Sequence, residues 1–422
     1  MNYKSFFKKE LDRFKDQGLY RNFREIDRPI NKFPKADETN GKKIRDVEVW
    51  CTNDYLNMSQ HPEVVNETVK TLLEIGSGSG GTRNISGTTS YHTALESCLA
   101  DLHNKSSALV FSSAYTANQS TLWTLGKKIK NMEIFSDELN HASLIQGIKN
   151  SGSHCTIFKH NDLEDLEEKL KSIEFKTPKL IVFESLYSMD GTITNVAEYV
   201  RLAKKYNALT YLDEVHAVGL YGERGSGIAN KYGVSKEIDI INGTLAKAFG
   251  QIGGYVAGDK YIIEFIRSFT PGFIFTTSLM PSVVAACKKS IEIVEQSNHL
   301  RSEVLEKAAY LKKNLDNLGI NYIKGDSHII PIIVNTAEKA QLFSQKLLDI
   351  HNIYTQPIFY PTVPKGSARL RITITPKHSL LDIDNLVGSL SKVLGNKKAV
   401  HRKDKKSSNS PLSRLNTFKT AS

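Results

Sequence analysis

The sequence contains no run of about 18 consecutive apolar residues, the length that a membrane-spanning helix needs. Its first residues also lack the apolar core of a secretory signal, because Lys8, Lys9 and Glu10 interrupt them. Asp12 and Asp16 are equally unlike the acid-poor transit peptides of organelles. These absences predict a cytoplasmic protein that does not span a membrane.

Cysteine is also scarce. The four cysteines, Cys51, Cys98, Cys155 and Cys287, are scattered, and no pair has the CxxC spacing. A zinc site or a disulfide framework needs cysteines in such groups. We therefore expect reduced, buried thiols and no bound metal.

The common nucleotide-binding signatures are missing or out of place. Residues 76–81 match G-x-G-x-x-G in their letters, but a dinucleotide site needs a strand before the glycines. Here a helical pattern opens at His61 and Pro62 and runs into the glycines, with Val65, Val69, Leu72 and Leu73 on one face. No Walker A lysine loop is present either. We therefore reject a nicotinamide or flavin site of the dinucleotide type.

The positive charge of the chain is concentrated at one end. Of the formal net charge of +11, residues 397–422 supply +7, from eight Lys or Arg against one Asp, which leaves +4 for the body. A body charge of this size suits anionic small substrates and does not require DNA or RNA. The tail is Ser-rich and poor in apolar residues, a composition typical of disorder.

The body of the chain alternates short apolar runs with helical patterns. The apolar runs predict strands near residues 47–51, 108–111, 133–135, 155–158, 180–183, 209–212 and 238–241. Among the intervening helices, 162–173 and 197–206 have the clearest periodicity. This alternation is typical of an α/β fold with a mostly parallel sheet and helices on both faces. An active site in such a fold forms at the carboxyl ends of the strands.

The length and the changes of pattern predict four regions. These are an N-terminal helix and extension (1–50), a large domain (51–290), a smaller α+β domain (291–396) and a basic disordered tail (397–422). In the first, Phe6, Phe7, Leu11 and Phe14 predict a helix over 2–17 that lies on a neighbour. In the third, a long helical pattern over 282–318 precedes strands at 328–334 and 369–375 and helices at 337–348 and 381–394.

Lys247 is the strongest candidate for chemistry. It lies in a loop of small and apolar residues, where a lysine must either reach water or be held for a reaction. Upstream, a predicted strand ends in Asp213, and His216 follows three residues later. A pyridoxal phosphate site needs a lysine for the Schiff base, a carboxylate for the pyridinium nitrogen and a donor near the ring oxygen. The 34 residues between Asp213 and Lys247 fit one βαβ unit.

Three other features are weaker when taken alone. The predicted loop 112–118 lies between a strand and a helix, so its amides could hold a phosphate. His141 follows a strand end and could stack on an aromatic cofactor, although a histidine there is more often structural. Arg369 and Arg371 alternate along a predicted strand and share one face. They could clamp a carboxylate, or be solvated or salt-bridged as strand arginines usually are.

Together these residues resemble the α-oxoamine synthases, which belong to the class-II pyridoxal-phosphate-dependent aminotransferases. The resemblance spans residues 3–395, and its most specific part is 76–88 (GSGSGGTRNISGT), followed by His92. Matching stretches are 53–56 (NDYL), 184–191 (ESLYSMDG), 213–222 (DEVHAVGLYG), 243–250 (GTLAKAFG) and 370–372 (LRI). The resemblance implies a fold type I transferase with a seven-stranded sheet in a pyridoxal-phosphate-binding large domain, and a homodimer.

Within the family, the chain is similar to members that condense glycine with succinyl-CoA and release CoA and carbon dioxide, at the first step of tetrapyrrole (haem) synthesis. The resemblance implies that Lys247 binds pyridoxal 5'-phosphate and takes a proton from glycine, with Asp213 at the ring nitrogen and His216 near the ring oxygen. Further implied cofactor contacts are His141, Ala114, Tyr115, Ser188 and Thr244, with Thr276 and Thr277 from the other subunit. Implied substrate contacts are Asn53, Ser188 and Arg371 for the glycine carboxylate, and Arg21, Thr82 and Asn84 for the succinyl carboxylate. Ser136 is a further implied substrate contact.

Two departures from the family pattern and three alternatives remain. Asn57 stands where the family usually has glycine, and Ile374 where it usually has proline. A sibling such as 2-amino-3-ketobutyrate CoA ligase, or another synthase with a different acyl-CoA, is the nearest alternative. Arg21 and Thr82 disfavour it, because an acetyl group has no distal carboxylate. A non-catalytic relative would be expected to lack Lys247, and a nucleic-acid-binding protein would carry its excess charge on the body.

Overall fold

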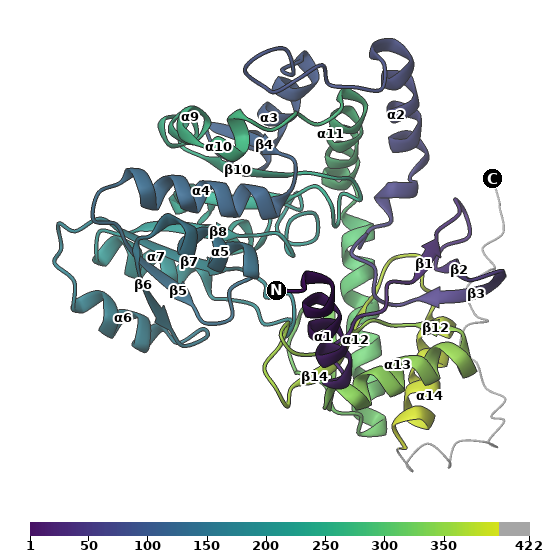
Figure 1. Ribbon diagram of the computed structural model, residues 1–422. Coiled ribbons are helices and arrows are strands. Elements are labelled where there is room, and N and C mark those ends of the chain that lie inside the picture. The colour runs from purple at the N-terminus through teal and green to yellow at the C-terminus, as the bar shows by residue number, and fades with distance from the viewer. Residues whose placement is uncertain (396–422) are drawn as a thin grey trace, which may run out of the picture.

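The computed structural model describes residues 1–395, so the predicted tail 397–422 lies outside the described residues. The larger part of the molecule is built around a seven-stranded sheet (Figure 1). Its strand order is β4-β10-β9-β8-β7-β5-β6. The strands are β4 Ser107–Phe111, β5 Glu133–Asp137, β6 His154–Phe158, β7 Lys179–Glu184, β8 Leu209–Asp213, β9 Ile240–Thr244 and β10 Gly254–Gly258. Only β10 runs antiparallel to its neighbours. The predicted mostly parallel α/β sheet is therefore confirmed.

Helices cover both faces of this sheet, which explains why its strands are apolar throughout. In β7, Ile181 and Phe183 enter one hydrophobic core, while Leu180 and Val182 enter another. The first core is shared with α3 Ser90–Leu102, α6 Leu163–Lys171, α7 Val196–Lys205 and α11 Pro281–Gln296. The second is shared with α4 Ala114–Lys128, α5 Ala142–Ser151 and α9 Lys260–Phe269.

Two smaller sheets complete the described chain. One has the order β11-β14-β13, with β11 Ile329–Asn335, β14 Ala368–Thr373 and β13 Pro357–Ile358. The other has the order β1-β2-β3-β12, with β1 Glu25–Asp27, β2 Lys35–Asn40, β3 Lys43–Val49 and β12 Ile353–Tyr354. The helices of this part are α12 Asn298–Leu318, α13 Ala337–His351 and α14 Leu380–Leu394. The domain boundaries at residues 50, 290 and 396 stay predictions.

Two local predictions were wrong in their bounds. The predicted loop 112–118 is mostly helix, because α4 begins at Ala114. Ser113 is its N-cap, and the Ser113 hydroxyl accepts the N–H of Thr116 at 3.1 Å. The helical pattern over 282–318 is two helices, since Ser297 has φ −100° and ψ 55° and separates α11 from α12. The sequence analysis also missed β10, whose five residues begin and end with glycine.

The N-terminal helices leave apolar side chains on the surface of the protomer. Helix α1 spans Tyr3–Asp16, which confirms the predicted N-terminal helix. None of its residues is buried. In α2 Pro62–Ile75, Leu73 is 82% exposed and Val69 is 49% exposed, although they belong to the face predicted to be apolar. The remaining short helices are α8 Ile228–Lys231, α10 Pro271–Ile274 and the 3-10 turns Met58–Gln60 and Ser235–Glu237.

The backbone accounts for the departure at Asn57 and for the glycine-rich segment. Asn57 has φ 57°, a left-handed conformation that favours glycine and that asparagine tolerates. Ile374, where proline is usual, is fully buried in the core of the C-terminal part. Helix α2 runs directly into Gly76, as expected, so residues 76–81 do not follow a strand. No helix within residues 1–395 has the length and apolar character to cross a membrane.

Candidate active site

Lys247 and Asp213 follow neighbouring strands at their carboxyl ends. Asp213 is the last residue of β8 and pairs with Asn242 of β9, and Lys247 lies three residues after the end of β9. The Lys247 side chain is half-buried. Desolvation lowers the pKa of Lys247 to about 8, with Asp213 and Glu184 opposing the shift and Arg371 adding to it. The amine is therefore partly neutral near neutral pH, as a nucleophile or base must be.

Asp213 is held by a buried hydrogen-bond chain. Asn118 on α4 donates to Oδ2 of Asp213 at 2.7 Å, and the N–H of Val215 donates to Oδ1 at 2.8 Å. The hydroxyl of Tyr211 in turn donates to the Asn118 amide oxygen at 2.8 Å. With both oxygens bonded, the carboxylate has one fixed orientation at the edge of the sheet.

His216 is a neutral imidazole in this site. Desolvation, and after it the charges of Lys247 and Arg371, hold the pKa of His216 well below its usual range. Nδ1 of His216 lies 2.8 Å from the hydroxyl of Tyr55, and that hydroxyl accepts a hydrogen bond from Arg371 at 3.1 Å. The Tyr55 hydroxyl also lies 3.4 Å from Oδ1 of Asn53, but its contact with Nδ1 is much shorter. We therefore assign the hydroxyl hydrogen to Nδ1 and the imidazole hydrogen to Nε2. His216 can then donate from Nε2.

Arg371 joins three chain segments. Its guanidinium donates to the carbonyl oxygen of Ser188 at 2.7 Å, to Oδ1 of Asn53 at 3.4 Å and to the Tyr55 hydroxyl. The neighbouring Arg369 donates to the carbonyl oxygen of Met189 at 3.0 Å. The structure thus brings together Asn53, Ser188 and Arg371, the three residues expected at the glycine carboxylate. Ser188 contributes its main chain to this contact.

His141 lies at the open side of the site. Its main-chain N–H donates to Oε1 of Glu184 at 2.6 Å, and its Nδ1 lies 2.7 Å from the Ser143 hydroxyl. The residue is exposed in the protomer, as is Tyr115, whose ring centroid lies 6.3 Å from that of His141. An exposed aromatic face at this place fits a planar cofactor. Ser136 is buried and accepts a hydrogen bond from Asn140 at 2.9 Å, so it supports this loop.

The amino end of α4 fits a phosphate group. No hydrogen bond among residues 1–395 uses the N–H groups of Ala114 and Tyr115, the first two of α4. A Cβ at Gly254 would lie 2.1 Å from the nitrogen of Ala114, so a glycine is required for this close approach. The Thr244 hydroxyl, which accepts the N–H of Ala246 at 3.1 Å, belongs to the adjacent strand. Free amides at a helix start are phosphate donors.

Thr82 and Asn84, which are expected at the acyl group, lie beside Thr276 and Thr277, whereas Arg21 lies elsewhere. Thr82 pairs with Thr277 in a short bridge, next to Thr276, and the Thr82 hydroxyl donates to Asn84 at 2.7 Å. Thr276 and Thr277 line a small cavity with Ser112 of the same protomer. Arg21 donates to the hydroxyl of Thr362 at 2.7 Å, on the C-terminal part of the chain. One protomer therefore does not bring Arg21 into contact with Thr82 or Asn84.

The sequence analysis assigned no role to several residues that shape the site. Asn118 is buried and donates to Asp213, which is 95 residues away in the sequence. Glu184 is buried and accepts from His141, which is 43 residues away. Tyr55 lies within the quoted NDYL stretch, and that motif was the available signal for it. For Asn118 no local signal existed, because a polar residue inside a helix is ordinary. In the described part of the chain, no three His, Cys, Asp or Glu side chains are grouped to hold a metal.

The comparisons with known proteins agree with this arrangement. The family model of class I and II aminotransferases matches residues 45–390. The 5-aminolevulinate synthase of Bradyrhizobium diazoefficiens is 49% identical over 393 residues, which are 93% of this chain and 96% of that protein. The 5-aminolevulinate synthase of Rhizobium meliloti is 50% identical over 391 residues, which are 92% and 96% of the two chains. The chain belongs to the 5-aminolevulinate synthase family.

Solved structures place this family member among pyridoxal-phosphate-dependent enzymes. A serine palmitoyltransferase solved with pyridoxal phosphate as an internal aldimine has a TM-score of 0.84 at 30% identity, and the match covers 92% of this chain and 96% of that chain. The 8-amino-7-oxononanoate synthase of Francisella tularensis has a TM-score of 0.72 at 26% identity, and the match covers 83% of this chain and 98% of that chain. The fold type I prediction is thereby confirmed, and the residues described above fit pyridoxal phosphate.

Proposed function

We propose that this chain condenses glycine with succinyl-CoA to form 5-aminolevulinate, with uptake of one proton and release of CoA and carbon dioxide. The observation that carries the proposal is that Lys247, at the carboxyl ends of the large sheet, has Asp213 of β8 and Arg371 of β14 as charged neighbours. A cytoplasmic location is part of the same proposal. Bound pyridoxal phosphate would supply an electron-withdrawing ring next to the glycine Cα.

The residues of the chain have separable tasks in this reaction. Asp213, fixed by Asn118 and Val215, would hold the proton of the cofactor ring nitrogen. Lys247 Nζ, with its pKa lowered to about 8, can bind the cofactor aldehyde and accept the Cα proton of glycine. Nε2–H of His216 can donate to the ring oxygen. Arg371 would hold the glycine carboxylate and would exchange part of its contact with Asn53 for it.

The acyl donor is the more specific part of the proposal. Burying the terminal carboxylate of succinyl-CoA requires fixed donors that replace its water. Arg21 offers a planar cation, and Thr82 and Asn84 offer a hydroxyl and an amide. Since one protomer keeps Arg21 apart from the other two, we propose that a second copy of the chain completes the acyl site.

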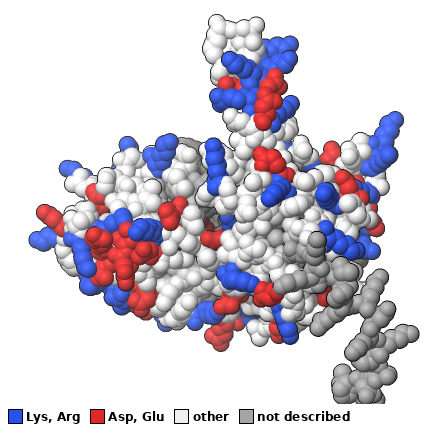
Figure 2. Space-filling model, turned by 90° about the horizontal axis from the view of Figure 1, so that it is seen from below, with Lys and Arg blue, Asp and Glu red and all other residues white. Residues whose placement is uncertain are grey.

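Surface features support a homodimer. Ile85 and Phe275, on the unit that carries Thr82 and Thr277, are each 80% exposed. Helix α1 stands out from the body at the top of Figure 2 and carries exposed Phe7 and Leu11. Large apolar side chains grouped on a surface mark a contact with another protein. A second copy would cover them.

Complementation tests the shared site. We expect a mixture of Lys247→Ala chains and Thr277→Asp chains to regain about a quarter of wild-type activity, because half of randomly formed dimers hold one intact site of two. A mixture of Lys247→Ala and Arg371→Ala chains should regain none, since both residues meet within one protomer. Full activity of a species that light scattering shows to be a monomer would end the dimer proposal.

Product analysis tests the reaction itself. The purified protein loaded with pyridoxal phosphate should release CoA from succinyl-CoA only when glycine is present, and 5-aminolevulinate should be detected in equal amount. Acetyl-CoA in the same assay distinguishes the alternative. A wild type that prefers acetyl-CoA would assign the chain to a reaction like that of 2-amino-3-ketobutyrate CoA ligase.

A further inference from the structure

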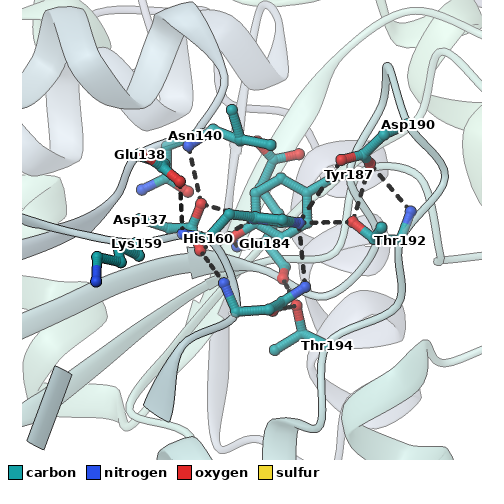
Figure 3. A network of polar contacts seen from close by, with 12 residues as sticks. Asp137, Glu138, Asn140, Lys159, His160, Glu184, Tyr187, Asp190, Thr192 and Thr194 are labelled. Carbon is teal, nitrogen blue, oxygen red and sulfur yellow. Dashed lines mark hydrogen bonds and ion pairs between the residues drawn. The ribbon is translucent and has the colours of Figure 1, made fainter. Parts of the chain in front are cut away.

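His160, in the loop after β6, contacts two other loops of the large sheet (Figure 3). Its Nδ1 lies 2.9 and 3.2 Å from the two carboxylate oxygens of Asp137. Its Nε2 lies 2.8 Å from the hydroxyl of Thr192 and 3.6 Å from Oδ2 of Asp190. The ring packs edge-on against Tyr187, with centroids 4.4 Å apart, and the side chain is 16% exposed.

The first of these loops carries His141. Asp137 is the last residue of β5, and its Oδ1 accepts the N–H of Leu139 at 2.9 Å. Asn140 then donates from its side chain to the carbonyl oxygen of Val182 at 2.9 Å. The main-chain N–H of the next residue, His141, donates to Oε1 of Glu184. The Asp137 carboxylate therefore anchors the start of the loop that presents His141.

The second loop carries the support of Arg371. Oδ1 of Asp190 accepts both the N–H of Thr192, at 3.0 Å, and its hydroxyl, at 2.9 Å. The N–H of Tyr187 donates to the carbonyl oxygen of Thr192 at 3.0 Å, which closes a turn over residues 187–192. The carbonyl groups of Ser188 and Met189 project from this turn to Arg371 and Arg369. Contacts at Asp190 and Thr192 thus set the place where Arg371 rests.

The hydrogen bonds indicate that His160 is charged. Nδ1 faces a carboxylate and must donate, and the Thr192 hydroxyl, whose hydrogen goes to Asp190, can only accept from Nε2. The side-chain amide of Asn161 lies 3.2 Å from Nε2 and could donate to it only if the ring were neutral. This single long contact is outweighed by the carboxylates of Asp137 and Asp190, which favour the charged ring. Burial lowers the pKa of His160, and Asp137, with Asp190 and Glu138, outweighs burial and raises it above the usual value.

We propose that His160, as an imidazolium, is a positioning residue that ties these two loops together and so orients Arg371 toward the glycine carboxylate. The inference rests on the proposed function, because glycine is the ligand whose carboxylate Arg371 would hold. It extends the glycine site to a residue that does not touch the substrate.

The proposal predicts a pH dependence of glycine binding. The groups that face His160 are Asp137 and Glu138 from β5 and its loop, and Asp190 and the Tyr187 ring from the turn. The side chain of Lys159, the preceding residue, points away from the ring (Figure 3). The cation is complete below the pKa of His160 and is lost as the pH rises through it. Because that pKa is raised above about 6.5, glycine affinity should fall on the alkaline side.

The test is a glycine titration of the loaded enzyme, followed by the absorbance of bound pyridoxal phosphate between pH 6 and 9. His160→Asn should weaken glycine binding about two- to thirty-fold at pH 7 and remove the alkaline fall in affinity. The KM for succinyl-CoA should stay within about twofold. Amide hydrogen exchange of residues 187–192 should be faster in the cofactor-free variant.

Two further variants keep the test decisive. Thr192→Val leaves the imidazole but removes the hydroxyl that links it to Asp190. It should also weaken glycine binding. It therefore tests the proposal even if His160→Asn does not fold. His154→Gln is the matched control, because His154 also pairs with a carboxylate, Glu133, but is exposed and contacts neither loop. It should behave as wild type.

Several results would overturn the role of His160. One such result is an unchanged glycine affinity in both variants. Another is an equal loss of affinity for glycine and succinyl-CoA with an unaltered pH profile, because that pattern would indicate a general loss of structure in the active site. A wild type that does not bind glycine would count against the proposed function. Amide exchange of residues 187–192, which needs no glycine, would still show whether His160 ties the loops.

Discussion

The carboxyl edge of the seven-stranded sheet and the glycine-rich loop 76–88 differ in how much of their chemistry one protomer completes. At the sheet edge, Asp213 has both oxygens bonded and Arg371 reaches two other segments of the same chain. In the loop, the Thr82 hydroxyl has one hydrogen-bond partner among residues 1–395, its neighbour Asn84, and Ile85 is 80% exposed. On the proposed function, the contacts to the cofactor ring and to glycine come from one chain, whereas acyl recognition and the contacts of Thr276 and Thr277 depend on what covers the loop.

The largest effect should come from the sheet edge. Lys247→Ala removes both the cofactor anchor and the base, and proton transfer alone is worth about 10²- to 10⁴-fold in rate. Borohydride reduction of the wild type should place the cofactor label on Lys247. Lys105 is the control, because burial also lowers its pKa to about 8, yet it donates to a main-chain carbonyl group and lies outside the site. A label on Lys105, or on no lysine, would refute the assignment.

Arg371 tests whether the glycine clamp is complete within one chain. A charge-assisted hydrogen bond is worth about 1.5–3 kcal/mol, so Arg371→Ala should weaken glycine binding about ten- to hundred-fold. Arg371→Lys keeps the charge but not the fork, and should recover only part of the loss. The succinyl-CoA KM is the internal control. If it rises as much as that of glycine, Arg371 does not act at the glycine carboxylate.

Arg21 tests the other side of the comparison. Arg21→Leu should lower kcat/KM for succinyl-CoA about ten- to hundred-fold and spare acetyl-CoA, which lacks the carboxylate. Glycine binding, measured from the spectrum of the bound cofactor, should not change. Similar losses for both acyl donors would show that Arg21 stabilises the chain near Thr362 and has no role in acyl recognition.

The smallest effect is a pH dependence of cofactor loading. Only neutral Lys247 can attack the aldehyde, and its pKa is lowered to about 8 mainly by desolvation. The neutral fraction therefore rises about fivefold between pH 7 and pH 8 and then levels off. The loading rate of cofactor-free protein, followed by absorbance, should rise in the same way. A rate that keeps rising steeply up to pH 10 would mean that the environment of Lys247 does not lower its pKa.

How far the sequence predicted the site depended on whether the signal was local. The spacing of Asp213, His216 and Lys247 was visible because each follows an apolar run that could only be a buried strand. Arg369 and Arg371 share one face because side chains alternate along a strand. By contrast, the start of α4 was placed too late, because the serines before it and Thr116 and Asn118 within it have low helix propensity, while tertiary packing buries Ala117 and Asn118.

The sequence by itself determined the alternation of strands and helices and singled out Lys247 and Asp213 as candidates, since periodicity and strand ends are properties of neighbouring residues. Only the tertiary structure decided which distant groups meet. Arg371 reaches Asn53 across 318 residues, and Asn118 reaches Asp213 across 95. It also placed His160 between two loops and left the apolar side of α1 uncovered. Such contacts follow from strand order and from how loops close over the sheet, and no local pattern encodes them.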